Sequence, residues 1–353
     1  MPSTNKAPHA ATLAIALPCA LVSAGAGAQI PVHHLDNGTV RAVVTEAIGG
    51  RLLSFGLAGR ANFLKVDEHA GDPDAPPDVR GPNVAYFGQE VWAGPQKQWW
   101  SHQTANPERA AAHAPWPPDP YLSLAKYTLA KKSATEIAFD GPASPVNGLQ
   151  LHKTYALVPG KPNSLQLDVT ATNRRAAQVA WDIWFNTRAH ADTRVYVPVA
   201  SKDDVRQEAV GEQPAGVEPL TWTLDDRVFS LDIPEAAPGT APRNGKIFLQ
   251  PAAGWMAGFH GGQVLIVQFP LQPRAAIHPD QGQIELYNDF HPQAIERGLM
   301  EMEVHAPYVH LAPGAKMSAR ELWTVLPYDG PATRAAHVAF LRAHAKTLGL
   351  EGL

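Results

Sequence analysis

The sequence predicts an all-β protein with a short helix at its C-terminal end. Strand-like runs, rich in β-branched and aromatic residues, recur from residue 29 nearly to the end, and glycine or proline separates them. The 33 prolines and 28 glycines supply many turns for a chain of 353 residues. Helical spacing of apolar residues occurs only near the C-terminus.

The bulk composition narrows the possible classes of function. With 45% hydrophobic and 18% charged residues, the chain has the balance of a soluble globular protein that can bury a large core. Its formal net charge of −4 provides no basic footprint, so nucleic acid is not expected as a partner.

The first 28 residues are predicted to be a cleavable secretory signal. Lys6 precedes a small-residue apolar run from Ala10 to Val22, and Ala26-Gly27-Ala28 has the A-x-A pattern of a cleavage site. The run is too short to span a bilayer. A buried helix, or a lipoprotein signal around Cys19, is the alternative. Cleavage after Ala28 predicts a periplasmic or secreted protein with no transmembrane segment and no cysteine.

Residues 29–330 are predicted to form one β-sandwich domain, with residues 331–353 as a helix packed on it. Gly49-Gly50 and Gly59 mark turns between two or three short strands in residues 39–66. Further strands are expected at residues 126–141, 149–158, 164–173, 178–187, 246–251, 263–270, 282–289, 298–311 and 318–327. The apolar stripe of the helix consists of Val338, Leu341, Ala345 and Leu348.

One stretch, Tyr86–Trp100 ("YFGQEVWAGPQKQWW"), holds three of the nine tryptophans and is predicted to be a loop. Irregular segments rich in proline lie on either side, at residues 67–82 and 101–121. Long loops in a strand-rich chain are usually functional or disordered, and the tryptophans argue against disorder.

The order of the motifs resembles galactose-mutarotase-like proteins. "GGRLLSFGLAGRANFL" resembles the opening hairpin of that group, "WDIWFNTRAHADTRVYVPV" its central strand, and "HLAPGAKMSARELWTV" its closing strand pair with a Pro-Gly turn. The tryptophan stretch followed by "WPPDPY", with the later "IELYND" and "MEMEV" strands, resembles an uncharacterised bacterial family of this fold. The resemblance implies a large antiparallel β-supersandwich, in which one of two packed sheets has a concave surface that receives sugar.

Alternation along the central strand separates two faces. Val179, Trp181, Ile183, Phe185 and Thr187 form an apolar face, and the opposite face carries Asp182, Trp184, Asn186 and Arg188. An aromatic ring among planar polar groups is typical of a sugar site, because ring C–H groups stack on tryptophan while hydroxyls form hydrogen bonds. The alternative is an outward face with one shielded tryptophan.

The tryptophan stretch is predicted to wall the same cleft. Glu90, Trp92, Trp99 and Trp100 would supply stacking platforms and hydrogen-bonding groups above the central strand. The competing interpretation is a hydrophobic plug that only shields the sheet.

The resemblance also implies candidate catalytic residues. Mutarotases use a glutamate on a late strand together with two histidines, and Glu285 is the best positional match for the glutamate. His102 could correspond to one histidine. Asp182 stands where the central-strand histidine is expected, and an ionised aspartate donates no proton at neutral pH. Ordinary mutarotation is therefore not predicted, and the Glu301/Glu303 pair reads as a charged solvent face.

These patterns predict an exported carbohydrate-binding or carbohydrate-active protein with a saccharide as its ligand. An epimerase-like isomerase or another saccharide-processing enzyme is the first hypothesis, and a non-catalytic saccharide-binding module of the bacterial envelope is the alternative. A structural protein of the envelope is a third. No metal and no cofactor are predicted, since zinc-helix spacing, a phosphate loop, a nucleophile elbow and a dinucleotide fingerprint are all missing from the sequence.

Overall fold

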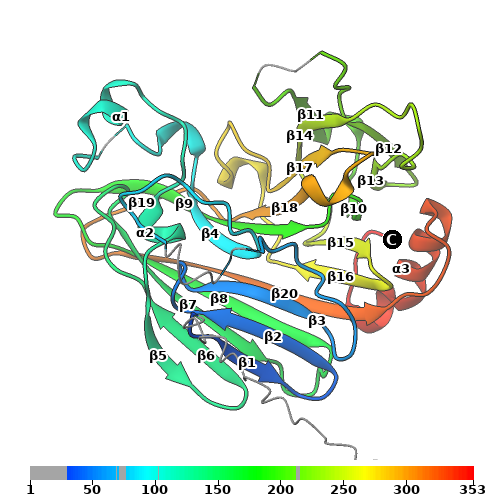
Figure 1. Ribbon diagram of the computed structural model, residues 1–353, viewed down its shortest axis with the longest axis horizontal. Helices are drawn as coiled ribbons and strands as arrows, with labels where there is room; N and C mark the ends of the chain where they lie inside the picture. Colours follow the sequence, from blue (N-terminus) through cyan, green and yellow to red (C-terminus); the bar gives the residue numbers. More distant parts are fainter. Residues whose placement is uncertain (1–29, 69, 71–76, 102, 212–214) are drawn as a thin grey trace, which may run out of the picture.

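A computed structural model describes residues 30–353, apart from residues 69, 71–76, 102 and 212–214. The predicted signal segment and His102 therefore lie outside the described residues. Two antiparallel sheets pack face to face and form the framework of the described chain (Figure 1). This arrangement confirms the predicted all-β supersandwich. No described helix combines the length and the apolar character needed to cross a membrane.

The first sheet has the strand order β1-β2-β3-β4-β9-β18-β17-β14-β11, and β19 pairs with the start of β9. The strand bounds are β1 His33–Asp36, β2 Val40–Thr45, β3 Arg51–Leu57, β4 Gln89–Gly94, β9 Val179–Ala189, β11 Val205–Glu208, β14 Arg243–Leu249, β17 Ile284–Phe290, β18 Leu299–His305 and β19 Val309–Leu311. The long strand β9 contains neither glycine nor proline and is buried along nearly its whole length, on both faces. It is therefore the strand around which the candidate site is built.

The second sheet has the order β12-β13-β10-β15-β16-β20-β8-β7-β6-β5. The strand bounds are β5 Thr128–Lys132, β6 Glu136–Asp140, β7 Leu149–Leu157, β8 Ser164–Asn173, β10 Arg194–Pro198, β12 Thr221–Asp225, β13 Val228–Asp232, β15 Trp255–His260, β16 Gln263–Gln268 and β20 Lys316–Pro327. Alternate residues of β7 are buried, as expected for a strand with one face on the core.

The described helices are short except for the last one. The three α-helices are α1 Pro107–Ala111, α2 Pro120–Ser123 and α3 Arg334–Leu348, and the 3₁₀ turns are η1 Gln96–Gln98, η2 Lys202–Asp204, η3 Arg274–Ala276 and η4 Ile295–Arg297. Thr333 caps the start of α3 by accepting a hydrogen bond from Ala336 N, and Gly349 ends it with a φ of +69°. Val338 and Leu341 are buried against β15 and β16, which confirms the predicted apolar stripe.

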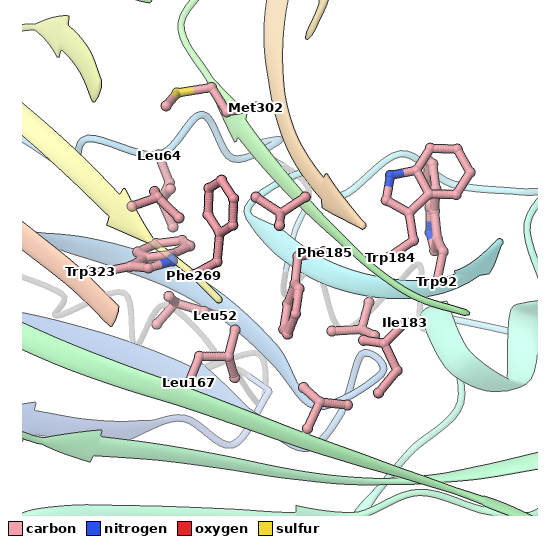
Figure 2. Close-up of a cluster of buried hydrophobic side chains, with 14 of the residues drawn as sticks. Leu52, Leu64, Trp92, Leu167, Ile183, Trp184, Phe185, Phe269, Met302 and Trp323 are labelled. Atoms are coloured by element: carbon pink, nitrogen blue, oxygen red, sulfur yellow. The ribbon is translucent and has the colours of Figure 1, made fainter. Parts of the chain in front are cut away.

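Apolar side chains from both sheets form one large core between them (Figure 2). Phe55 of β3 meets Trp323 of β20 edge to face, with ring centroids 5.8 Å apart. The predicted Gly-Gly turn is present, and Gly49 has a φ of +64°. A Cβ atom there would lie 2.5 Å from Ser123 O, so glycine permits α2 to pack closely on this turn.

Candidate functional site

Five neighbouring strands, β4, β9, β18, β17 and β14, place the candidate residues on one face of the first sheet. Residues paired directly across antiparallel strands project to the same side. One row of paired residues is Glu90, Asn186, Glu303 and Glu285, and a second row is Trp92, Trp184 and His305. The structure therefore brings together side chains that are far apart in the sequence.

His305 lies between two carboxylates at the centre of this face. Its Nδ1 is 3.2 Å from Asp182 Oδ2, and its Nε2 is 3.3 Å from Glu285 Oε1. Burial alone would lower the pKa of His305, but the two carboxylates outweigh it and raise the pKa to about 9. The imidazole is therefore protonated at neutral pH.

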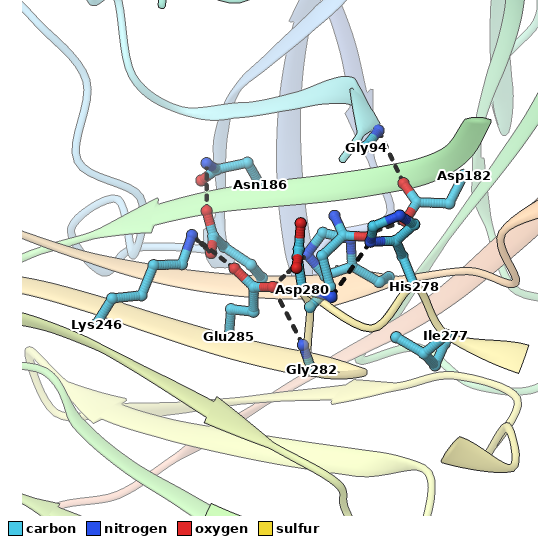
Figure 3. A network of polar contacts seen from close by, with 12 residues as sticks. Gly94, Asp182, Asn186, Lys246, Ile277, His278, Asp280, Gly282 and Glu285 are labelled. Atoms are coloured by element: carbon cyan, nitrogen blue, oxygen red, sulfur yellow. Dashed lines mark hydrogen bonds and ion pairs between the residues drawn. The ribbon is translucent and has the colours of Figure 1, made fainter. Parts of the chain in front are cut away.

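Asp182 and Gln281 hold the imidazole ring of His305 in place. Asp182 Oδ1 accepts a hydrogen bond of 2.8 Å from Gly94 N, which orients the carboxylate (Figure 3). The side-chain amide of Gln281 lies 2.9 Å from Nδ1 of His305, and it accepts from the protonated ring when its oxygen faces that nitrogen.

Lys246 of β14 bridges the other two acids. Its Nζ lies 2.7 Å from Glu285 Oε2 and 2.8 Å from Glu303 Oε2, while Asn186 Nδ2 donates to Glu303 Oε1 at 2.8 Å (Figure 3). Burial and the neighbouring acids raise the pKa of Glu303 to about 8. Burial opposes the ionisation of Glu285 too, but Lys246 and His305 lower its pKa to about 2. The two carboxylates share Lys246 as a counter-ion, and burial of two acids so close together opposes the ionisation of both.

The interpretation of Glu301 and Glu303 as a solvent face is wrong. The Glu303 side chain is fully buried. Glu301 Oε1 accepts a hydrogen bond of 2.9 Å from Arg188 Nε. Their partners come from other strands, Arg188 from β9 and Lys246 from β14, which the alternation of a single strand does not reveal.

Glu90 and Arg188 form a second charged group beside the first. Glu90 Oε1 is bound by Arg188 Nη1, and Glu90 Oε2 lies 2.7 Å from Arg51 Nη2. Burial opposes ionisation of Glu90, but the two guanidinium groups lower its pKa to about 2. Arg188 also lies over the ring of Trp92, with Cζ 4.6 Å from its centroid.

Trp92 of β4 packs on Trp184 of the central strand (Figure 2), and Trp99, directly after η1, packs on it as well. Trp92 meets Trp184 edge to face at 4.9 Å between ring centroids, and Trp99 lies 5.8 Å from Trp184. Trp116 covers Trp92 and Trp99 and is 52% exposed, whereas Trp184 is only 2% exposed. We call these four residues the tryptophan cluster. In the described conformation the cluster closes over the polar face.

Trp100 lies outside the tryptophan cluster. Its Nε1 donates to Pro117 O at 2.7 Å, and the guanidinium of Arg109 lies over its ring. Trp99 Nε1 donates to Ala93 O at 2.5 Å. The predicted loop over Tyr86–Trp100 is wrong for residues 89–94, which form β4 because they pair with β9 along its length.

Several buried polar atoms on this face have no hydrogen-bond partner among the described residues. They include Nε1 of Trp92, Nε1 of Trp184 and Oδ1 of Asn186. Native proteins satisfy most buried polar groups, so water or a ligand can supply partners for these atoms.

Most of the predicted residues thus meet on one face: Glu90, Trp92, Trp99, Asp182, Trp184, Asn186, Arg188 and Glu285. The sequence reasoning missed His305 and Lys246 as members of the site. His305 shares a face of its strand with Glu303, which was an available signal, but Lys246 lies at the start of an apolar run and gave none. The described residues contain no group of three or more His, Cys, Asp or Glu arranged to hold a metal ion.

Solved structures with a TM-score of at least 0.50 agree with the fold. A protein from Synechocystis sp. PCC 6803 matches at 12% identity over 85% of this chain and 97% of its own, with a TM-score of 0.52. A TPR-domain containing protein from Parabacteroides distasonis matches at 17% identity over 86% of this chain and 49% of its own, with a TM-score of 0.50. A galactose mutarotase-like protein from Lactobacillus casei matches at 14% identity over 84% of this chain and 100% of its own, with a TM-score of 0.49.

At the level of sequence, no curated protein matches the chain. A family model described as a domain of unknown function, DUF4380, matches residues 30–326. This span includes every strand that contributes to the polar face. The chain therefore belongs to the DUF4380 family, and its fold is a large antiparallel β-supersandwich.

Proposed function

We propose that the protein binds a saccharide on the face that carries Trp184 and processes it by acid–base chemistry. One observation carries the proposal: a protonated imidazole and an ionised carboxylate, His305 and Glu285, lie 3.3 Å apart among buried polar atoms that lack partners. An acid and a base held together in a water-poor site are the requirement for general acid–base catalysis.

The reaction that fits these charge states is epimerisation at an anomeric carbon. Glu285 takes the proton from the anomeric hydroxyl, the bond between the anomeric carbon and the ring oxygen breaks, and His305 gives its proton to that oxygen. The open-chain carbonyl then closes from its other side, and both protons return. His305 supplies the proton donor that Asp182 does not, and Asp182 acts as the positioning residue for the ring.

Access to this face requires side chains of the tryptophan cluster to move. Trp99 and Trp184 are each 2% exposed, and Trp116 lies outermost. A sugar ring takes over the stacking contacts that Trp184 makes with Trp92 and Trp99. Its hydroxyl groups reach the unpartnered indole Nε1 atoms and Asn186 Oδ1.

The first test compares the wild type with Glu285→Gln on a panel of aldoses and short saccharides, with anomer exchange followed by NMR. Glutamine retains the shape but holds no ionisable proton, so the exchange rate should fall by about 10²–10⁴-fold while saccharide binding is retained. Glu208→Gln is the control, because Glu208 lies exposed on β11 of the same sheet. Equal rates in wild type and Glu285→Gln would remove Glu285 from the mechanism.

The second candidate is a saccharide-binding module without catalysis. The close packing of the tryptophan cluster favours it, as does the lowered pKa of Glu285, about 2, which makes this carboxylate a weak base. Saccharide binding without anomer exchange or any other turnover would favour this candidate.

We also propose that the protein is exported, with cleavage after Ala28. The support is the pattern of the first 28 residues: Lys6, an apolar run and an A-x-A site. Mass spectrometry of protein recovered from a Gram-negative host should show an N-terminus at Gln29. Recovery of the intact chain from the cytoplasm alone would contradict export.

A further inference from the structure

Lys246 lies where the two acids of the candidate site meet. Glu285 and Glu303 are direct partners across β17 and β18, so their carboxylates project to the same side of the sheet. Nζ of Lys246 contacts both of them, at 2.7 and 2.8 Å (Figure 3). The acid–base chemistry proposed above uses Glu285 and His305 but assigns no role to this ammonium group.

Charges alternate along a chain of five side chains, which we call the charge chain: Asp182, His305, Glu285, Lys246 and Glu303. His305 lies between Asp182 and Glu285, and Lys246 lies between Glu285 and Glu303. The carboxylates of the charge chain are at most 2% exposed, and Lys246 is 13% exposed. Because water is largely excluded, the two cations are the main counter-charges of the three acids.

Lys246 is held in place as an ammonium group. Two of its three N–H bonds can point to the two acids, and its Nζ lies 4.7 Å from the ring centroid of Trp184. Burial opposes the charge, but the neighbouring acids outweigh it and raise the pKa of Lys246 above its ordinary value. A protonated amine has no lone pair, so Lys246 is not a nucleophile for the open-chain carbonyl.

The charged and titratable groups that face Glu285 come from three other strands. They are Lys246 of β14, His305 and Glu303 of β18, and Arg206 of β11. Of the two cations that contact Glu285, Lys246 is the closer, at 2.7 Å against 3.3 Å for His305. Arg206 is paired with Glu208. Without Lys246, the three acids of the charge chain would have His305 as their only cation within it, an arrangement that favours uptake of a proton.

We infer that Lys246 is a positioning residue, which keeps the Glu285 carboxylate ionised beside Glu303 and holds it against Nε2 of His305. The inference rests on the proposed function, because only an ionised Glu285 can take the proton of a sugar hydroxyl group. Glu303 then serves to hold Lys246 from its other side, and Asn186 fixes Glu303 in turn.

The test titrates the full chain, labelled with ¹³C at the glutamate side-chain carboxyl carbons, by NMR from pH 3 to 9. Lys246→Met keeps most of the side-chain length but has no charge, and Lys246→Arg keeps the charge. Spectra of Glu285→Gln and Glu303→Gln identify the two signals. The Glu285 midpoint should rise by about 1–3 pH units in Lys246→Met, since an opposite charge at this distance lowers a carboxyl pKa by that amount. Lys246→Arg should restore most of the difference.

The pH profile of anomer exchange in the same variants is the second readout. In Lys246→Met the acid limb of the rate should move upward together with the Glu285 midpoint, and Lys246→Arg should move it back. A merely structural role would lower the rate by the same factor at every pH. Lys131→Met is the matched control, because it removes an exposed lysine from β5 of the other sheet and should change neither readout.

A double variant keeps the test informative if Lys246→Met alone is too unstable to study. Lys246→Met/Glu303→Gln removes one buried acid together with the lysine, so the balance of buried charge is retained. Its Glu285 midpoint should still lie above that of Glu303→Gln alone, because Lys246 is the closest cation to Glu285.

The outcomes separate this inference from the proposed function. An unchanged Glu285 midpoint after loss of Lys246, in the single or the double variant, would overturn the inference and leave the proposed function standing. A raised midpoint in a protein whose wild type exchanges no anomers would support the role of Lys246 at Glu285 and overturn the proposed catalysis.

Discussion

At the scale of single residues, Glu90 shows how a predicted ligand contact becomes a structural one. The sequence placed Glu90 in the wall of a sugar cleft. Both of its carboxylate oxygens are instead bound by guanidinium groups, of Arg51 and Arg188, inside the sheet. Glu90 therefore holds Arg188 in position over Trp92 rather than presenting a free acceptor.

Replacing Glu90 with Gln should destabilise the protein. The change leaves two buried guanidinium groups without their counter-ion, which costs about 3–5 kcal/mol in comparable buried pairs. Urea denaturation at pH 7 measures the free energy of unfolding. Glu136→Gln is the control, because it breaks a largely exposed pair with Lys131 that contributes about 0–1 kcal/mol. Equal losses in both variants would contradict the buried role of Glu90.

The same residues mark what the sequence could and could not predict of the site. Alternation along one strand placed Trp184, Asn186 and Arg188 together, because the period of a strand is a local property. It did not show that His305 reaches Glu285, since that contact depends on the pairing of β17 with β18 and on the burial of both.

At the scale of elements, β4 was predicted as loop and is a strand. Gly88 and Gly94 bound a run of only five residues, too short to show a clear period. Its strand conformation depends on pairing with β9, which lies about ninety positions later in the chain. β15 was not among the predicted strands, and it contains Gly258. A Cβ atom there would lie 2.9 Å from Met302 Sδ, so the glycine permits close packing of the sheets.

Within the tryptophan cluster, the buried Trp184 should contribute more to the free energy of unfolding than the exposed Trp116. Trp184→Ala removes a ring that is 2% exposed and should lower the free energy of unfolding by about 3–5 kcal/mol. Trp116→Ala removes a ring that is 52% exposed and should cost less than about 1 kcal/mol. Urea denaturation measures both losses, as shifts of the midpoint if the m-value is the same in the wild type and the variants. Similar losses would show that Trp116 supports the cluster as strongly as Trp184.

At the scale of the whole molecule, buried ionisable groups predict an acid-shifted stability maximum. Burial raises the pKa of Glu321 to about 8, and burial and acidic neighbours raise that of Glu303 to about 8. Their stabilising contributions are complete below the unfolded pKa of about 4.3 and are lost as pH rises toward 8. The pKa of His305 is raised to about 9, so its contribution to the free energy of unfolding is lost as pH rises from about 6.5 to 9.

Three other groups limit stability at low pH. Glu90 and Glu285 have pKa values lowered to about 2, so their contributions are lost as pH falls from about 4.3 toward 2. Burial, with Arg194, lowers the pKa of His337 to about 4, which adds a loss as pH falls from about 6.5 to 4. The thermal midpoint should therefore be highest between about pH 4.5 and 6.

Thermal unfolding from pH 4 to 9 measures this profile, with Glu321→Gln as the comparison. Glutamine has no proton to lose, so the variant's midpoint should fall less than that of the wild type between pH 5 and 8. Glu321 is suited to this comparison because it is fully buried and one of its oxygens accepts only from Trp323 Nε1, at 2.9 Å. A wild-type maximum at pH 8 or above would contradict the prediction.

The supersandwich fold was predictable from the sequence. The Gly-Gly turn, the central strand and the closing Pro-Gly turn follow one another in the order that the resemblance to the family implies. The missed strands β1, β11, β12 and β13 have only four or five residues each, too few to show a clear period. Burial of the polar face was not predictable, since it results from five strands that pair across the whole chain.

The contact between Trp184 and His305 also has an optical consequence. Their ring centroids lie 4.7 Å apart, and the ammonium group of Lys246 lies 4.7 Å from the Trp184 ring. A protonated imidazole in contact with an indole quenches its fluorescence by electron transfer from the excited ring. Trp184 should therefore be dark in the closed protein and brighten when His305 loses its proton or when a bound molecule parts the rings. The intrinsic fluorescence of Trp184 should therefore report, without any label, whether the face is closed or occupied.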